Sequence, residues 1–151
     1  MSYTDRVLAY VTREREGRRE LLVFDHRDHP EAGTQVPAGR LEPDEDLEAG
    51  LLRELEEEAG LAEARIVRKF ATFGPRELPH GRAYTNHAYE LEAPGARDEW
   101  EHTVVGDGDD AGLVFRYRWV PLEPEPTLWG TRDPVLEPLL AASETDRRPR
   151  G

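Results

Sequence analysis

Residues 39–61 read GRLEPDEDLEAGLLRELEEEAGL, and they are the most informative part of this chain. From Asp44 to Ala59 the composition favours an α-helix, with Pro43 and Gly60 as start and stop signals. Apolar residues recur there at helical spacing and predict one stripe that faces a core: Leu47, Leu51, Leu52, Leu55 and Ala59. The segment therefore predicts an amphipathic helix that follows a glycine-containing loop.

The polar face of this predicted helix carries a cluster of carboxylates. Glu54, Glu57 and Glu58 stand at positions i, i+3 and i+4, so their side chains project from one patch. Carboxylates this close repel one another unless a cation lies between them. Oxygen ligands without a nearby His or Cys suit Mg²⁺ or Mn²⁺. A solvated face of a charged helix also explains three glutamates, and only the spacing of the longer segment decides against it.

Two groups beside the carboxylates could support a metal site. Arg53 can reach neighbouring carboxylates and fix their orientation. Gly39 lets the preceding loop approach closely, and the backbone carbonyl of Ala38 could complete the coordination of the metal.

The whole segment resembles the Nudix box, the signature of the Nudix hydrolase family, G-x5-E-x7-R-E-U-x-E-E-x-G-U with U an aliphatic residue. Every specified position is present: Gly39, Glu45, Arg53, Glu54, Leu55, Glu57, Glu58, Gly60 and Leu61. The resemblance implies an α/β fold, the α/β/α sandwich of that family with a mixed β-sheet between helices. It also implies a pyrophosphohydrolase that uses Mg²⁺, or Mn²⁺ in its place, and attacks phosphorus with water.

The family pattern also implies a role for each polar residue of the box. Glu57 and Glu58 are the principal metal ligands, and Glu54 is a ligand or the general base. Arg53 and Glu45 orient these groups, and we count Glu54, Glu57 and Arg53 as catalytic. The loop departs from the pattern, since many relatives have two glycines where this chain has alanine and then glycine. Alanine still offers its carbonyl, although it resists a left-handed backbone.

Family members often recruit a further acidic residue from a later loop as ligand or base. We predict an acidic loop over Pro94–Gly112, and within it we select Glu101, which stands between Trp100 and His102. A solvated acidic loop is the alternative interpretation. The candidates weighed were Glu99, Glu101, Asp107, Asp109 and Asp110.

Three residues after the box form the predicted substrate-binding set: Arg76, Arg82 and Tyr84. An arginine fork suits phosphate, and an aromatic ring suits stacking on a base. Ordinary residues of a strand surface are the alternative interpretation.

The remaining sequence predicts strands on both sides of the box and a second helix near the end. No repeat or linker divides it, so we expect one domain over 1–142 and a polar, flexible tail over 143–151. A hairpin turn is expected around Gly17. The predicted elements are strands at Val7–Val11, Leu21–Phe24, Ala64–Phe73, Ala83–Leu91 and Leu113–Val120, and a helix at Asp133–Ala142.

Composition limits the partners that we expect. The formal net charge of -12 argues against binding to nucleic acid, which needs clustered positive charge. The chain has no cysteine, which excludes disulfides and a thiol nucleophile and is compatible with a reducing cytosol. No secretory signal or run of about 20 apolar residues is present. We therefore expect a cytoplasmic protein with no nucleic-acid or membrane partner, and homodimer formation stays open. The small nucleotide diphosphate substrate that we expect is implied by the resemblance to the Nudix family.

Two other functions are weighed against hydrolysis. A Nudix-like module that senses a nucleotide without cleaving it would commonly have lost box glutamates, and none is lost here. An isomerase of the isoprenoid type would usually need a cysteine. Pro75 falls close to where ADP-ribose members of the family tend to carry a proline, although a turn that includes Pro79 also explains it. Among substrates, we favour ADP-ribose or a nucleotide sugar over a nucleoside triphosphate.

Overall fold

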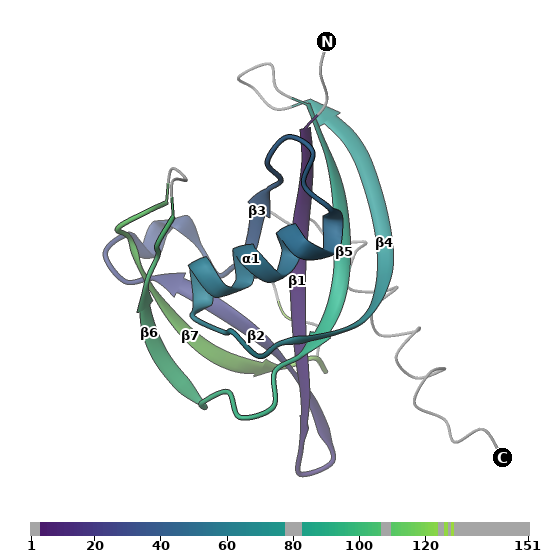
Figure 1. Ribbon diagram of the computed structural model, residues 1–151. Coiled ribbons are helices and arrows are strands. Elements are labelled where there is room, and N and C mark those ends of the chain that lie inside the picture. Colours follow the sequence, from purple (N-terminus) through teal and green to yellow (C-terminus); the bar gives the residue numbers. More distant parts are fainter. Residues whose placement is uncertain (1–3, 78–82, 107–109, 124–125, 127, 129–151) are drawn as a thin grey trace, which may run out of the picture.

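The computed structural model describes residues 4–77, 83–106, 110–123, 126 and 128 of the chain (Figure 1). Strands dominate these residues, and one α-helix crosses the sheet that they form (Figure 1). The elements in chain order are β1 (Thr4–Arg15), β2 (Arg18–His26), the 3-10 helix η1 (Pro30–Ala32), β3 (Ala38–Arg40), α1 (Leu47–Ala59), β4 (Arg65–Glu77), β5 (Ala83–Glu92), β6 (Glu99–Thr103) and β7 (Val114–Pro121).

Strand β1 joins the two halves of the sheet. The strand order is β4-β5-β1-β2-β7-β6, and β3 pairs with β1 outside this path. Thr4–Val11 of β1 run parallel to β5, whereas Thr12–Arg15 pair antiparallel with β2. The sheet is therefore mixed, which confirms the predicted fold class. Helix α1 lies between the half formed by β4 and β5 and the half formed by β6 and β7 (Figure 1).

The predicted hairpin joins β1 and β2. Glu16 and Gly17 have positive φ angles of 53° and 78°, as both central residues of a type I′ turn do. Arg15 and Arg18 are partners across this turn. The turn type matches the twist of the two strands, so the hairpin is determined locally.

Both ends of α1 are capped by the residues next to them. The Asp46 side chain accepts a hydrogen bond from the backbone N–H of Ala49 at 3.2 Å. Gly60 has a left-handed φ of 74°, and its N–H donates to the Glu56 carbonyl. Asp44, the predicted first residue, has a φ of 65° and belongs to the preceding turn, so the helix begins three residues later than predicted.

The apolar stripe of α1 is narrower than predicted. Leu51 and Leu55 are fully buried, and Ala59 is buried beside them. Leu52 is 38% exposed, so its predicted place in the stripe was wrong. Successive helical residues are rotated by about 100°, which turns Leu52 away from the sheet when Leu51 faces it.

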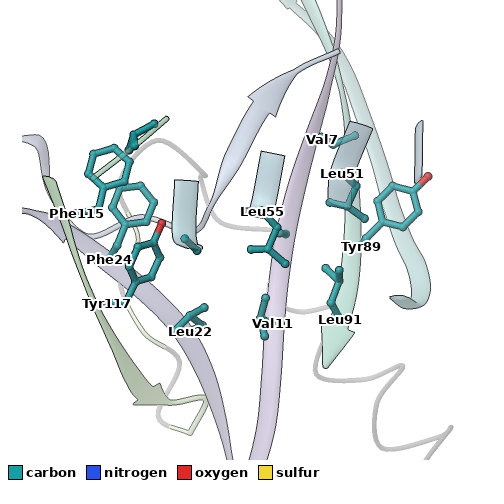
Figure 2. Close-up of a cluster of buried hydrophobic side chains, with 13 residues drawn as sticks. Val7, Val11, Leu22, Phe24, Leu51, Leu55, Tyr89, Leu91, Phe115 and Tyr117 are labelled. Atoms are coloured by element: carbon teal, nitrogen blue, oxygen red, sulfur yellow. The ribbon is translucent and has the colours of Figure 1, made fainter. Parts of the chain in front are cut away.

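Two apolar cores lie on the two faces of the sheet. Alternate residues of β1 contribute to each, since Val7, Ala9 and Val11 face α1 whereas Leu8 and Tyr10 face the other core. Figure 2 shows the core beneath α1, where the helix leucines meet side chains from both halves of the sheet. Its labelled members are Val7, Val11, Leu22, Phe24, Leu51, Leu55, Tyr89, Leu91, Phe115 and Tyr117.

The segment Pro94–Gly112 is not a loop throughout, which corrects the prediction. Residues 99–103 form β6, an edge strand antiparallel to β7. Trp100 and His102 alternate there with glutamates, a period of two that is typical of a strand and that the acidic composition obscured. The predicted second helix and the tail lie outside the described residues. Within the described part of the chain, no helix is long and apolar enough to cross a membrane.

Two leucines of α1 test this assignment of its buried face. Leu55→Ala should lower the free energy of unfolding by about 2 to 5 kcal/mol, because it leaves a cavity at a fully buried position. Leu52→Ala is the matched control at a partly exposed position and should cost less than about 1 kcal/mol. Urea unfolding of both variants measures the difference. Equal losses would show that Leu52 also belongs to the core.

Candidate functional site

One arginine contacts three of the carboxylates in the box. Arg53 forms a two-pronged pair with Glu45, with Nε and Nη2 at 2.7 and 2.8 Å from the two carboxylate oxygens. Its Nη1 donates to Glu54 at 3.1 Å and to Glu57 at 2.9 Å. The pair with Glu45 fixes the plane of the guanidinium, so the third nitrogen is held toward the other two carboxylates.

The pair between Arg53 and Glu45 is charged over the whole physiological range. The hydrogen bond from Arg53 lowers the pKa of Glu45 to about 2. The same bond raises the pKa of Arg53 above its ordinary value. Glu45 also accepts from the backbone N–H of Glu42 at 3.0 Å, which ties the side chain to the loop before α1.

Glu58 is the most deeply buried carboxylate of the box. Its exposed fraction is 5%, and the backbone N–H of Ala38 donates to it. Burial raises the pKa of Glu58 well above its ordinary value, and the charges of Glu54 and Asp110 raise it further. A carboxylate in these surroundings favours either a proton or a cation next to it.

Gly39 lies against the carboxylate of Glu54. A Cβ atom at Gly39 would lie 2.0 Å from Cδ and 2.1 Å from Oε2 of Glu54. Only glycine lets the loop backbone come this close. Burial raises the pKa of Glu54 to about 7, and the charge of Glu57 adds to the rise while Arg53 opposes it. The box glycine therefore shapes the space around a carboxyl group that titrates near neutral pH.

Ala38 needs no left-handed conformation. It lies in β3 opposite Leu8, and among the described residues only Glu16 and Asp44 combine a side chain with a positive φ. The carbonyl of Pro37 accepts from Ala9 on β1 at 2.8 Å. Polar backbone groups alternate in direction along a strand, so the N–H and carbonyl of Ala38 point away from β1, and the N–H donates to Glu58. The alanine that replaces a glycine of the family pattern thus fits this backbone.

The donor atoms at this site suit a hard divalent cation. The candidates predicted from the sequence are all oxygens: the carboxylates of Glu54, Glu57 and Glu58 and the carbonyl of Ala38. Within residues 4–77, 83–106 and 110–123, no three acidic, histidine or cysteine side chains converge to enclose a metal by themselves. Mg²⁺ takes only one or two carboxylates and keeps several waters or substrate oxygens. An open, partial set of candidate oxygen ligands around a buried carboxyl group therefore fits a Mg²⁺ ion that also binds water or substrate. It does not fit a structural metal site, in which protein ligands fill every position.

The structure does not bring Glu101 to the box. Its carboxylate accepts from Arg116 at 2.7 Å and lies 3.5 Å from Arg27. Trp100 and His102 face α1, and neighbouring residues of a strand point to opposite faces. Glu101 therefore lies on the far side of β6 from the carboxylates that it was selected to join.

Among the described candidates from this segment, Asp110 lies near the box. Its charge contributes to the raised pKa of Glu58. The turn that carries it is closed by backbone hydrogen bonds, among them Gly112 to the Val104 carbonyl at 2.9 Å and Leu113 to the Asp110 carbonyl at 3.0 Å. Sequence reasoning included Asp110 among the candidates, but neither charge nor spacing distinguished it from the others. Asp107 and Asp109 lie outside the described residues.

Gly106 is a site residue that sequence reasoning missed. Its φ is 106°, and a Cβ there would lie 2.8 Å from the carboxyl carbon of Glu57. The neighbouring Val105 N–H donates to the Glu57 carbonyl at 3.1 Å. The sequence feature that could have indicated this contact is a glycine that follows two valines and precedes an acidic segment.

The three predicted substrate residues are placed only in part. Arg82 lies outside the described residues. Arg76 is a β4 residue opposite Tyr84 of β5, and only its backbone is described. Tyr84 pairs with Thr4 of β1 in a continuous parallel register. Tyr89, five residues further on, packs in the core beneath α1, so strand alternation places Tyr84 on the opposite face.

Comparison with known proteins adds independent information. The family model described as NUDIX domain matches residues 2–139. No match to the chain is found among the curated proteins.

Solved structures with the same fold are found at low sequence identity. The NUDIX domain of NrtR from Shewanella oneidensis, complexed with ADP ribose, has a TM-score of 0.67 and 17% identity, over 95% of this chain and 90% of that one. An Ap4A hydrolase from C. elegans has a TM-score of 0.67 and 15% identity, over 94% and 98%. A UDP-X diphosphatase has a TM-score of 0.68 and 16% identity, over 97% and 66%. At these identities the likeness concerns the fold.

The raised pKa of Glu54 predicts a pH dependence of stability in the absence of divalent cations. Its carboxyl has a pKa of about 7 in the folded protein, against an ordinary value of 4.5. Between these values the folded protein holds a proton that the unfolded chain has released, so the contribution of Glu54 to stability falls as the pH rises. Glu54→Gln cannot titrate. It should be more stable than the wild type at pH 8 by about 1 to 3 kcal/mol, and nearly equal at pH 5.

Urea unfolding in the presence of a chelator, at both pH values, measures this difference. Added Mg²⁺ should raise the stability of the wild type at pH 8 more than at pH 5, because it competes with protons for the same carboxylates. A stability difference between the two proteins that does not change with pH would contradict the assignment of a raised pKa to Glu54.

Proposed function

The chain belongs to the Nudix family of pyrophosphohydrolases, and we propose that it hydrolyses the diphosphate linkage of a nucleoside diphosphate derivative in a Mg²⁺-dependent reaction. One observation carries this proposal. The buried carboxylate of Glu58 lies beside the charges of Glu54 and Asp110, next to the backbone of β3. Such a set of negative groups is stable only with protons or a cation among them. An oxygen-only site that can take up a cation also suits a substrate that carries phosphates.

The proposed metal ligands are Glu57, Glu58 and the carbonyl of Ala38, with Glu54 as a further ligand or the general base. Bound Mg²⁺ would neutralise the charge of the phosphate oxygens and hold the diphosphate in place. Arg53 keeps Glu54 and Glu57 in position through its hydrogen bonds to both. Gly39 leaves room for the Glu54 carboxylate beside the loop.

Glu54 is suited to accept the proton of the attacking water. A general base must be able to bind a proton, and in the protein without metal, burial raises the pKa of Glu54 to about 7. In the proposed step the water oxygen bonds to phosphorus, the bridging P–O bond breaks, and the water proton passes to the carboxylate. Asp110 is the proposed second acidic residue, in place of Glu101, because it lies near Glu58.

The substrate class is proposed to be ADP-ribose or a nucleotide sugar. The position of Pro75 and the likeness to a NUDIX domain complexed with ADP ribose support this choice. The similar structures include an Ap4A hydrolase and a UDP-X diphosphatase at nearly the same TM-score, so a test must cover all three kinds of compound. A cytoplasmic location, predicted from the sequence, stays part of the proposal.

A substrate panel with Mg²⁺ or Mn²⁺ tests the proposed reaction. Each nucleoside diphosphate derivative is incubated with the protein, and monophosphate products are detected through a coupled phosphatase. The wild type should turn over at least one compound in a metal-dependent manner. Glu54→Gln should lower kcat by about 10²- to 10⁴-fold, because the proton acceptor is lost.

Two further variants on the active compound separate the acidic candidates. Asp110→Asn should lower kcat, whereas Glu101→Gln, which removes a charge paired with Arg116, should lower it much less. The reverse order would exclude Asp110 in favour of Glu101. A silent panel in which one nucleotide still binds tightly would favour a sensing module over an enzyme.

Gly39→Ala tests the contact between the loop and Glu54. The added methyl group would overlap the Glu54 carboxylate, which can move because it ends a flexible side chain. We expect a loss of about 10²-fold in kcat/KM from the displaced carboxylate, with a change in unfolding free energy below about 1 kcal/mol.

A double-mutant cycle identifies the cause of this loss. In a Glu54→Ala background, Gly39→Ala should cause little further decrease in kcat/KM or in Mn²⁺ affinity, since the displaced group is already absent. A full additional loss in that background would show that Gly39 acts through another group.

A further inference from the structure

The last turn of α1 has no unpaired carbonyl. A helix leaves the carbonyls of its final four residues without partners inside the helix. In α1 these belong to Glu56, Glu57, Glu58 and Ala59. The Glu56 carbonyl accepts from the N–H of Gly60 at 2.9 Å, which is the ordinary cap of a helix that ends in glycine. The other three carbonyls are bound by groups outside the helix.

The donors to these three carbonyls all come from the β6–β7 half of the sheet. Tyr117 donates its hydroxyl to the Glu58 carbonyl at 2.9 Å. Trp100 donates its indole N–H to the Ala59 carbonyl at 2.9 Å. His102 Nε2 lies 3.0 Å from the Glu57 carbonyl, which also accepts from the N–H of Val105 at 3.1 Å. We call Trp100, His102 and Tyr117 the carbonyl clamp.

The side chains of the clamp are themselves held in place. Trp100 is opposite Tyr117 across β6 and β7, and their rings stack with centroids 5.0 Å apart and planes at 11°. Trp100 and His102 lie two residues apart on β6 and so face the same way. His102 must donate through Nε2, because a carbonyl can only accept, and its ring rests on Gly60, where a Cβ would lie 2.8 Å from Nδ1.

The hydrogen bonds at this end of α1 fix the orientation of the helix, which apolar packing alone does not. Leucine packing resists separation of helix and sheet but is not directional, so it tolerates small rotations and slides of the helix. Hydrogen bonds from fixed donors to successive carbonyls specify both the rotation and the height of the final turn. Two of the clamped residues, Glu57 and Glu58, carry the proposed metal ligands on their side chains.

We propose that Trp100, His102 and Tyr117 are positioning residues that hold the last turn of α1 at the rotation at which the Glu57 and Glu58 carboxylates can share one divalent cation. All three side chains bond carbonyl groups of α1, so they act through the helix backbone. The inference rests on the proposed function for the cation and for Glu57 and Glu58 as its ligands. It adds residues outside the box to the set that determines metal affinity.

The test compares Mn²⁺ affinity with stability in the full-length protein. Trp100→Phe removes the indole N–H and keeps an aromatic ring, and Tyr117→Phe removes only a hydroxyl. Each should weaken Mn²⁺ binding by about tenfold or more, as losses of supporting hydrogen bonds around metal ligands do. Free Mn²⁺ is measured by electron paramagnetic resonance at a temperature at which circular dichroism shows each variant to be folded.

The chain offers a matched control for each variant. Trp119→Phe also removes an indole N–H that donates to a backbone carbonyl, that of Arg97 at 3.0 Å, which is not a residue of α1. Tyr10→Phe also removes a hydroxyl from a fully buried tyrosine, in the core on the other face of the sheet. Both controls should change the Mn²⁺ dissociation constant by less than twofold, even where they lower the unfolding temperature.

Substitution of His102 gives a rescue experiment. His102→Gln keeps an N–H donor and should retain more of the Mn²⁺ affinity than His102→Leu, which has none. In parallel, amide hydrogen exchange without metal should be faster at Gly60 and at the last turn of α1 in Trp100→Phe and Tyr117→Phe than in the two controls.

The outcomes separate this inference from the proposed function. Unchanged Mn²⁺ affinity in the folded clamp variants would overturn the clamp and leave the proposed function intact. The clamp would also be overturned if Mn²⁺ affinity fell in proportion to the unfolding temperature in the clamp variants and in the controls alike. Such a result would indicate a general loss of stability and no specific positioning role. If the wild type itself binds no Mn²⁺, the proposed function fails, and the positioning role fails with it even where hydrogen exchange reveals the clamp.

Discussion

Glu58 is a carboxyl group that water scarcely reaches, and the arrangement of the site depends on how its charge is compensated. Burial and the charges of Glu54 and Asp110 together raise its pKa. The N–H of Ala38 donates one hydrogen bond, which offsets only part of the penalty. The charges left around Glu58 are mostly of its own sign. A structural carboxylate in a core is normally paired, whereas one that faces other carboxylates is suited to share a cation.

Arg53 makes this concentration of negative charge compatible with a folded protein. Its pair with Glu45 places one guanidinium between carboxylates that would otherwise repel one another directly. The arginine neutralises the rim of the cluster, where Glu45, Glu54 and Glu57 meet. One side of α1 is thus fixed by an ion network, and its final turn is fixed by hydrogen bonds from the sheet.

The fold brings together three segments that are distant in sequence. Strand β1 changes partners along its length, so the sheet bends into two halves with α1 between them (Figure 1). The branch strand β3 brings Gly39 against Glu54, and the turn after β6 brings Gly106 against Glu57. Glycines at these two contacts let backbone approach carboxylate from both sides. The helix supplies the charges, and the bend of the sheet determines what surrounds them.

Much of this architecture was predictable because its causes are local. The type I′ turn at Gly17, the cap at Gly60 and the alternation along β1 depend on neighbouring residues, and the box spacing alone identified the family. Leu52 was misplaced because the width of a buried stripe depends on the surface it meets. Glu101 was preferred to Asp110 because nearby aromatic residues suggested a site, although strand alternation turns Glu101 away from α1. Composition and spacing thus determined which groups can bind a cation, and only the tertiary structure decided which of them meet, because contacts across a bent sheet depend on strand register.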